Sequence, residues 1–199
     1  LDNQVNIAFV GHVDHGKSSI LGRLLVDTSS LPNGKLEQLK AYSERNAKDF
    51  EYAYLIDALE KEQSQGITID MARYFIRSGG RKFMFIDTPG HLDLIKNMIT
   101  GSSTADIGLL IVDAKEGIKE NTLRHVFLLS FLKIHQVIVL INKMDKVGYS
   151  KDVFRELSEE LVRAFALHGI KAEAILPISA KLGDNLIGLS NNTPWYQGA

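Results

Sequence analysis

Short apolar runs alternate along this chain with segments that repeat apolar residues every three or four positions. The apolar runs predicted to be strands are residues 5–10, 67–76, 82–87, 107–114, 136–142 and 172–179. The last three are apolar almost throughout, which is typical of strands covered on both faces. Helical periodicity follows residue 17, where Ile20, Leu21, Leu24 and Leu25 share one face, and returns at about 92–103, 120–133 and 151–168.

Alternating strands and helices predict an α/β fold with a doubly wound, mostly parallel sheet. One pair of strands departs from this rule, because only Arg-Ser-Gly-Gly-Arg (77–81) separates 67–76 from 82–87. Such a short glycine-containing connection predicts a hairpin, and therefore one antiparallel pair at an edge of the sheet. Residues 28–65 form a long polar, partly helical excursion, which we expect to be a functional or mobile insertion.

Composition narrows the class of protein. The chain has 199 residues, which fits one domain, and its net charge of −1 provides no overall basic field for nucleic acid. We therefore expect no direct DNA binding. There is no cysteine, no signal peptide and no long apolar span, so we expect a cytoplasmic protein away from membranes. The first residue is Leu1, which suggests a fragment of a longer protein.

The stretch GHVDHGKSS (11–19) carries the most specific motif. Gly11, Gly16, Lys17 and Ser18 fill the pattern G-x-x-x-x-G-K-[ST], between a predicted strand and a predicted helix. Such a loop cradles phosphates with its backbone N–H groups, while the lysine reaches the outer phosphates and the serine hydroxyl binds Mg²⁺. The alternative is a plain glycine turn. The loop residues predicted to contact a nucleotide are Gly11, His12, Val13, Asp14, His15, Gly16, Lys17, Ser18 and Ser19.

Two further motifs lie where a γ-phosphate and its metal would be. In DTPGH (87–91), Asp87 is predicted to bind Mg²⁺ through a water, and the Gly90 N–H to contact the γ-phosphate. In GITID (66–70), Thr68 is predicted to complete the metal shell. The alternatives are a surface turn for the first motif and an ordinary β-branched strand residue for the second.

The predicted base-reading residues follow the last two strands. In NKMD (142–145), the Asp145 carboxylate can only accept hydrogen bonds, and guanine offers it a ring N–H and an amine that adenine lacks. Asn142 and Lys143 are predicted to brace this pocket. Ser179, Ala180 and Lys181 are predicted to complete it, with the Ala180 N–H on the guanine oxygen. The alternative is a charged loop without a ligand. The motifs together favour guanine over adenine, and thus a GTPase over an ATP-dependent kinase.

These loops, in this order, resemble the GTPases of the translation-factor superfamily across nearly the whole chain. The resemblance implies a P-loop G domain that uses GTP or GDP and Mg²⁺, with a monovalent cation near Asp14. It also implies that His91 orients the attacking water once a partner docks, and that Val13 and Ile67 gate that histidine. His91 could instead cap the following helix. No arginine in these motifs is an evident finger, so we expect slow intrinsic hydrolysis. A binding switch with incidental hydrolysis is the alternative to an enzyme.

Two subgroups share the long insertion and an ending like NNTPWYQG. One contains elongation factor 1-alpha and release-factor relatives, and the other the GTPase subunit of sulfate adenylyltransferase. His12 and His15 resemble the translation subgroup, while Gln65 and Arg124 resemble the sulfate subgroup. The balance of motifs favours the sulfate subgroup, which implies a small ATP-sulfurylase-type subunit as partner. The alternative implies the ribosome and tRNA.

The resemblance also implies a division of the chain. Residues 1–190 are predicted to be the GTP-binding domain, with 28–65 as its switch or insertion region. Residues 191–199 lose periodicity, and both subgroups continue there into β-barrel domains. We therefore expect 191–199 to begin a linker.

Overall fold

Six strands form one sheet in this computed structural model, which describes residues 4–12, 14–31, 34–45, 51–64, 72–87 and 105–198. The strands are β1 (Gln4–Gly11), β2 (Ala72–Ser78), β3 (Arg81–Asp87), β4 (Ile107–Asp113), β5 (Gln136–Asn142) and β6 (Lys171–Pro177). Their order across the sheet is β2-β3-β1-β4-β5-β6, and every neighbouring pair is parallel except β2 and β3. The predicted fold class is confirmed.

The helices are α1 (Lys17–Asp27), α2 (Lys35–Arg45), α3 (Tyr52–Ser64), α5 (Glu120–Phe131), α6 (Lys151–Leu167) and the short 3₁₀ helix η1 (Met144–Val147). The helices predicted after residue 17 and at 120–133 and 151–168 are therefore confirmed. The described part of 28–65 contains α2 and α3, as expected of a partly helical insertion. The helix predicted at 92–103 lies outside the described residues. None of the helices within the described ranges is long and apolar enough to cross a membrane.

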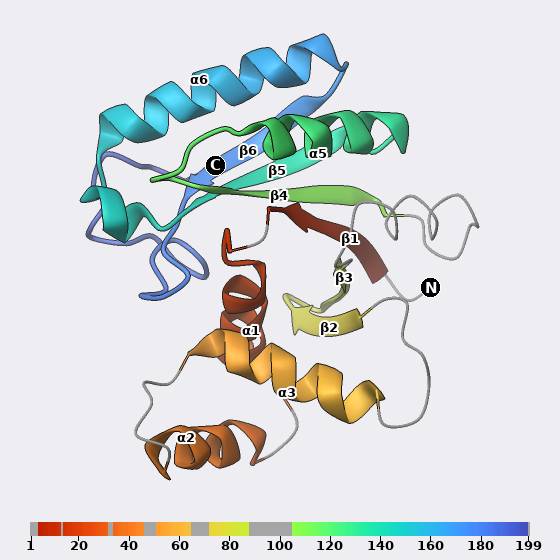
Figure 1. Cartoon of the computed structure of the whole chain (residues 1–199), viewed down its shortest axis with the longest axis vertical. Helices are drawn as coiled ribbons and strands as arrows, with labels where there is room; N and C mark the ends of the chain where they lie inside the picture. The colour runs from red at the N-terminus through yellow and green to blue at the C-terminus, as the bar shows by residue number, and fades with distance from the viewer. Residues whose placement is uncertain are drawn as a thin grey trace.

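Helices cover the sheet on both faces. In Figure 1, α5 and α6 lie on one side of the sheet, and α1 and α3 lie on the other. Alternate residues of each central strand enter one of two apolar clusters: Leu110 and Val112 of β4 pack with α5 and α6, whereas Leu109 and Ile111 pack with α1 and α3. Burial on both faces explains why these strands are continuous apolar runs.

The hairpin between β2 and β3 turns on two glycines. Ser78 pairs with Arg81, and Gly79 and Gly80 between them have φ values of 55° and 73°. Positive φ at both central residues defines the hairpin turn whose twist matches the flanking strands, and glycine adopts it without a Cβ penalty. This turn confirms the predicted antiparallel edge.

Helix α1 packs against the sheet and against α3. Ile20, Leu21 and Leu25 are buried on its predicted apolar face, and Leu24 is partly buried. Gly22 lies where α3 begins: a Cβ at this position would be 2.2 Å from the carbonyl oxygen of Tyr52. Since the obstacle is backbone rather than a movable side chain, only glycine allows the two helices to approach this closely.

We expect Gly22→Ala to lower the free energy of unfolding by about 1–3 kcal/mol, because overpacking outweighs the gain in helix propensity. Urea denaturation measures the change. The matched control is Gly188→Ala, since a Cβ at Gly188 has no atom within 4 Å. A Gly22→Ala protein as stable as the control would show that α3 does not pack on α1 as described.

Candidate nucleotide-binding site

The predicted phosphate loop and the two predicted base-recognition loops meet at one edge of the sheet. In parallel strands the carboxyl ends lie together, and here β1 ends at Gly11, β4 at Asp113 and β5 at Asn142. Asp113 and Asn142 are direct neighbours across β4 and β5, and Gly11 pairs with Ile111. Loops 11–19, 142–145 and 179–181 are therefore brought together, although more than 150 residues separate the first from the last.

Each glycine of the phosphate-loop motif is required by a neighbour. Gly16 has φ 96°, and a Cβ there would lie 2.4 Å from Asn142 Nδ2. A Cβ at Gly11 would lie 2.9 Å from the carbonyl oxygen of Ile111. Gly16 also precedes α1, and no side chain caps the first turn of that helix. Its N–H groups, with the positive end of the helix dipole, suit an anion.

Lys17 and Ser18 open helix α1 and carry the groups assigned to phosphate and metal. Lys17 Nζ donates to the carbonyl oxygens of Gly11 (2.8 Å) and His12 (3.2 Å), so the ammonium is held over the loop. The Ser18 hydroxyl makes no hydrogen bond to any other residue in the described part of the chain, which leaves it available as an oxygen ligand. These groups fit a Mg²⁺-bound phosphate.

Asn142 joins three loops. Its Nδ2 donates to the carbonyl of His15 (2.8 Å), and its Oδ1 accepts the N–H of Ala180 (3.0 Å). The Ala180 N–H was predicted to contact a guanine oxygen, but in this structure it donates to Asn142. Ala180 is only 3% exposed, and a buried N–H without a partner would be costly.

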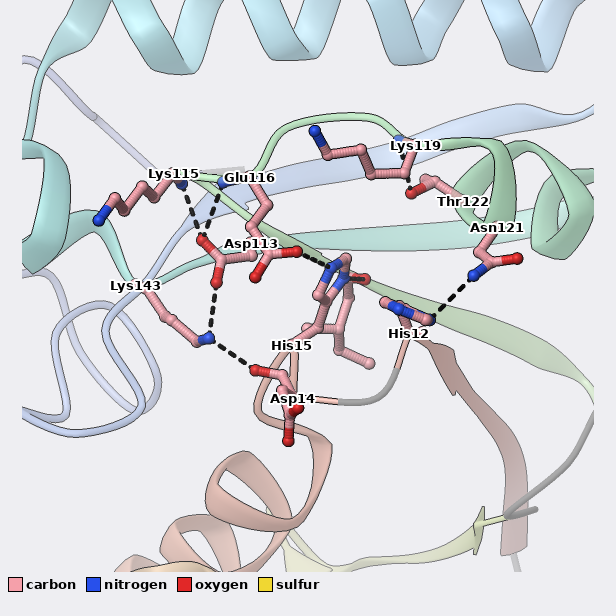
Figure 2. Close-up of polar contacts among 12 residues, drawn as sticks. His12, Asp14, His15, Asp113, Lys115, Glu116, Lys119, Asn121, Thr122 and Lys143 are labelled. Carbon is pink, nitrogen blue, oxygen red and sulfur yellow. Dashed lines mark hydrogen bonds and ion pairs between the residues drawn. The ribbon is translucent and has the colours of Figure 1, made fainter.

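Lys143 adds a second brace beside Asn142. Its Nζ lies 2.6 Å from the Asp14 carbonyl and 2.6 Å from Asp113 Oδ2, as Figure 2 shows. Asp14 and Lys143 both have left-handed backbones, with φ 64° each. Lys143 thus connects the phosphate loop to the end of β4. The same contacts tie segment 142–145 to the sheet.

Asp145 and Ser179, which were predicted to read the base, are hydrogen-bonded to each other. Ser179 Oγ donates to Asp145 Oδ1 over 2.7 Å, which leaves the other carboxylate oxygen, Oδ2, without a hydrogen bond to the described residues. Asp145 is half-buried, whereas Lys181 is exposed and offers its carbonyl to Arg23 (3.4 Å). Asp145 is therefore oriented by Ser179, and Lys181 acts here through its backbone.

The two histidines of the phosphate loop use their rings for packing. His15 is fully buried and its Nδ1 donates to the carbonyl of Ile111 (3.2 Å) in β4. Burial lowers the pKa of His15, so the ring is neutral at pH 7. His12 stacks edge-on against it and lies 3.2 Å from Asn121 Nδ2 at the start of α5. Asn121 was not identified from the sequence, because its contact with His12 spans 109 positions.

Asp113 was also missed. It accepts the N–H groups of Lys115 (2.8 Å) and Glu116 (3.3 Å) and the ammonium of Lys143, and it is 2% exposed. Burial acts to raise its pKa, but the lysine and the N–H groups outweigh it and the pKa lies below the usual value. A lone aspartate ending the apolar run 107–114 was the available signal.

Several assigned residues fall outside the described part of the chain: Gln65, Ile67, Thr68, Gly90, His91, and Val13 within the phosphate loop. Asp87 ends β3 beside Phe9 of β1, which places its backbone at the same edge of the sheet. Its side chain is not among those described. Ser18 is thus the one described side chain among the assigned metal ligands.

Comparison with known proteins identifies the family. Residues 2–192 match the family profile described as the elongation factor Tu GTP binding domain. The chain belongs to this family. As a GTP-binding domain of the translation-factor superfamily, it uses guanine nucleotide and Mg²⁺.

Elongation factors 1-alpha are among its relatives. The chain is 43% identical over 194 residues to that of Thermococcus kodakarensis and 44% identical to that of Thermococcus onnurineus. Each alignment covers 98% of this chain and 45% of the relative, so the chain spans less than half the length of these proteins.

Solved structures agree with the sequence relatives. The GTP-binding domain resembles sup35 complexed with GDP (26% identity) and with GMPPNP (27% identity), each with a TM-score of 0.67 over the whole chain and 43% of sup35. These relatives support the translation subgroup. The sulfate subgroup, which the balance of motifs favoured, finds no support among them.

We expect Asp113→Asn to lower the free energy of unfolding by about 1–3 kcal/mol at pH 7, because Lys143 loses its buried partner charge. The folded-state pKa of Asp113 lies below that of the unfolded chain. Its contribution is therefore full above the unfolded pKa and is lost as the pH falls through the folded pKa. The difference between wild type and variant should shrink as urea denaturation is repeated from pH 7 toward pH 3.

The matched control is Asp152→Asn, in an exposed pair with Arg155 whose aspartate side chain is 74% exposed. Exposed pairs contribute about 0–1 kcal/mol. Equal, pH-independent effects of the two substitutions would contradict the role given to Asp113.

Proposed function

We propose that this chain binds GTP and hydrolyses it to GDP and phosphate as the switch domain of a translation factor of the elongation factor 1-alpha or release-factor type. The observation that carries the proposal is Asn142, whose two hydrogen bonds hold the phosphate loop and the base-reading loops in one site. A triphosphate-binding loop beside a guanine-specific loop fits a guanine nucleotide as the ligand.

The base is read by Asp145. Ser179 holds one carboxylate oxygen, and the carboxylate accepts the ring N–H and the amine of guanine. At these two positions adenine has an acceptor ring nitrogen and no amine, so it would leave the carboxylate without donors. Asn142 and Lys143 hold the loop in place, and the Ala180 N–H reaches the guanine oxygen only by sharing or leaving Asn142 Oδ1.

The phosphates are held by loop 11–19. The N–H groups of the loop and of the first turn of α1 surround them, and Lys17 turns its ammonium from the loop carbonyls to the outer phosphates. Mg²⁺, when bound, supplies charge that stabilises the departing phosphoryl group. Ser18 of α1 would be one of its ligands, Thr68 and a water on Asp87 would be further ligands, and Asp14 would lie near a monovalent cation.

Hydrolysis is assigned to His91, which positions the attacking water, and to Gly90, whose N–H senses the γ-phosphate. Val13 and Ile67 gate the histidine until a partner docks. The 43–44% identity to elongation factors 1-alpha supports the ribosome and tRNA as the partners, and the cytoplasm as the place of action. The sulfate-activating subunit stays the alternative partner on the strength of Gln65 and Arg124. Arg124, however, is exposed on α5 and pairs with Glu120 rather than with the site.

We expect Asp145→Asn to weaken GDP binding by about 100-fold and to strengthen xanthosine diphosphate binding, because an amide matches the xanthine edge. Titration with fluorescent GDP, competed by xanthosine, inosine and adenosine diphosphates, measures the change. Asp152→Asn, at an exposed position of α6, is the control. Unchanged preference for guanine in Asp145→Asn would remove Asp145 from base recognition.

We expect ribosomes to accelerate GTP hydrolysis, and His91→Ala to abolish that acceleration without changing GDP affinity. Phosphate release is measured with the complete gene product that contains this chain, alone, with ribosomes, and with an ATP-sulfurylase subunit plus ATP and sulfate. Acceleration only by the sulfurylase mixture would replace the translation role with sulfate activation. Acceleration that survives His91→Ala would remove His91 from the reaction.

A further inference from the structure

Tyr149, just after η1, occupies an unusual backbone conformation. Its φ is 54°, in the left-handed region that bulky side chains rarely adopt. All three of its polar groups are bonded. Its N–H donates to the carbonyl of Met144 (2.9 Å), its carbonyl accepts Trp195 Nε1 (3.1 Å), and its hydroxyl donates to Asp184 Oδ2 (2.6 Å). These three hydrogen bonds therefore hold Tyr149 in a backbone conformation that tyrosine rarely adopts.

Asp184, which accepts the hydrogen bond of the Tyr149 hydroxyl, lies in the loop after Ser179. Its second oxygen, Oδ1, accepts Ser190 Oγ (2.5 Å) and Asn192 Nδ2 (3.1 Å). Burial acts to raise the pKa of Asp184, but these hydrogen bonds and that from Tyr149 lower it overall. Burial and the neighbouring Asp184 raise the pKa of Tyr149 to about 12. At neutral pH the bond therefore joins a protonated phenol to a carboxylate, which is a strong type of hydrogen bond.

The same two loops are joined again at Asp145. Ser179 Oγ donates to Asp145 Oδ1 (2.7 Å), and the Ser179 N–H donates to the carbonyl of Asp184 (3.2 Å). The Met144 N–H donates to the carbonyl of Ile178 (3.1 Å). The contacts close a ring that runs from Tyr149 through Met144 and Asp145 to Ser179 and Asp184, and back to Tyr149. The Tyr149–Asp184 bond closes that ring.

We infer that Tyr149 and Asp184 are positioning residues that fix the Asp145 carboxylate for guanine and so set the specificity of the site for the base. The inference rests on the proposed function of Asp145. Neither residue needs to touch the nucleotide. Removing the bond between them frees the loop 179–184 to move relative to 142–147, and Ser179 then holds Asp145 less firmly.

The test is Tyr149→Phe, which removes one hydroxyl and keeps the ring. Its matched control is Tyr196→Phe. The Tyr196 hydroxyl is buried and has no hydrogen-bond partner among the described residues. Affinities for GDP and inosine diphosphate, which lacks the guanine amine, are measured by calorimetry. Thermal unfolding without nucleotide is followed in parallel.

We expect Tyr149→Phe to weaken GDP binding about tenfold and to reduce the preference for GDP over inosine diphosphate about threefold, while Tyr196→Phe changes neither. Asp184→Ala, which removes the acceptor of the Tyr149 hydroxyl, should also reduce the preference for GDP over inosine diphosphate. The double variant should lose less than the sum of the two single variants, because both remove the same bond. Asp184→Ala also provides the test if Tyr149→Phe does not fold.

The inference is overturned if Tyr149→Phe keeps the wild-type preference for GDP over inosine diphosphate. This holds whether its affinities are unchanged or fall equally for both nucleotides. An equal fall together with a lower unfolding temperature would show that the bond is purely structural. A wild-type protein that does not prefer GDP over inosine and adenosine diphosphates would instead overturn the proposed function of Asp145, which is a different outcome.

Discussion

The side chain of Asn142 is the contact on which the site depends. It ends β5, donates to the carbonyl of His15 in loop 11–19 and accepts from the N–H of Ala180 in loop 179–181. Its amide occupies the space that a side chain at Gly16 would need. The left-handed turn at Gly16, the start of α1 and the position of 179–181 therefore all follow from one buried amide. A buried amide bonded at both ends has one orientation, which makes the loops a single preformed unit.

The positively charged side chains around this unit are each held by negatively charged or carbonyl oxygens. Lys143 lies between the Asp113 carboxylate and the carbonyl of Asp14, and Lys17 rests on two loop carbonyls. Both ammonium groups are thereby held near the phosphate loop. This local arrangement accounts for a phosphate site in a protein with a net charge of only −1, because the attraction comes from a few oriented groups and a helix end.

The motif residues that distinguish the translation subgroup from the sulfate subgroup have different surroundings in the structure. His12 and His15, which resemble the translation subgroup, are buried against β4 or bonded to α5, so they belong to the packing of the site. Arg124, which resembles the sulfate subgroup, forms an exposed pair of the kind that contributes little to stability. The relatives agree with the histidines.

The sequence alone determined the fold class, the hairpin and the residues that meet at the carboxyl edge of the sheet. It could do so because strand periodicity, glycine turns and the loop motifs are local patterns. Only the tertiary structure decided that Ala180 donates to Asn142, that Asp113 holds Lys143, that His12 meets Asn121, and that Tyr149 reaches Asp184. These contacts join residues 30 to 109 positions apart. Their partners are chosen by how strands and loops pack in three dimensions, a choice that no local pattern in the chain records.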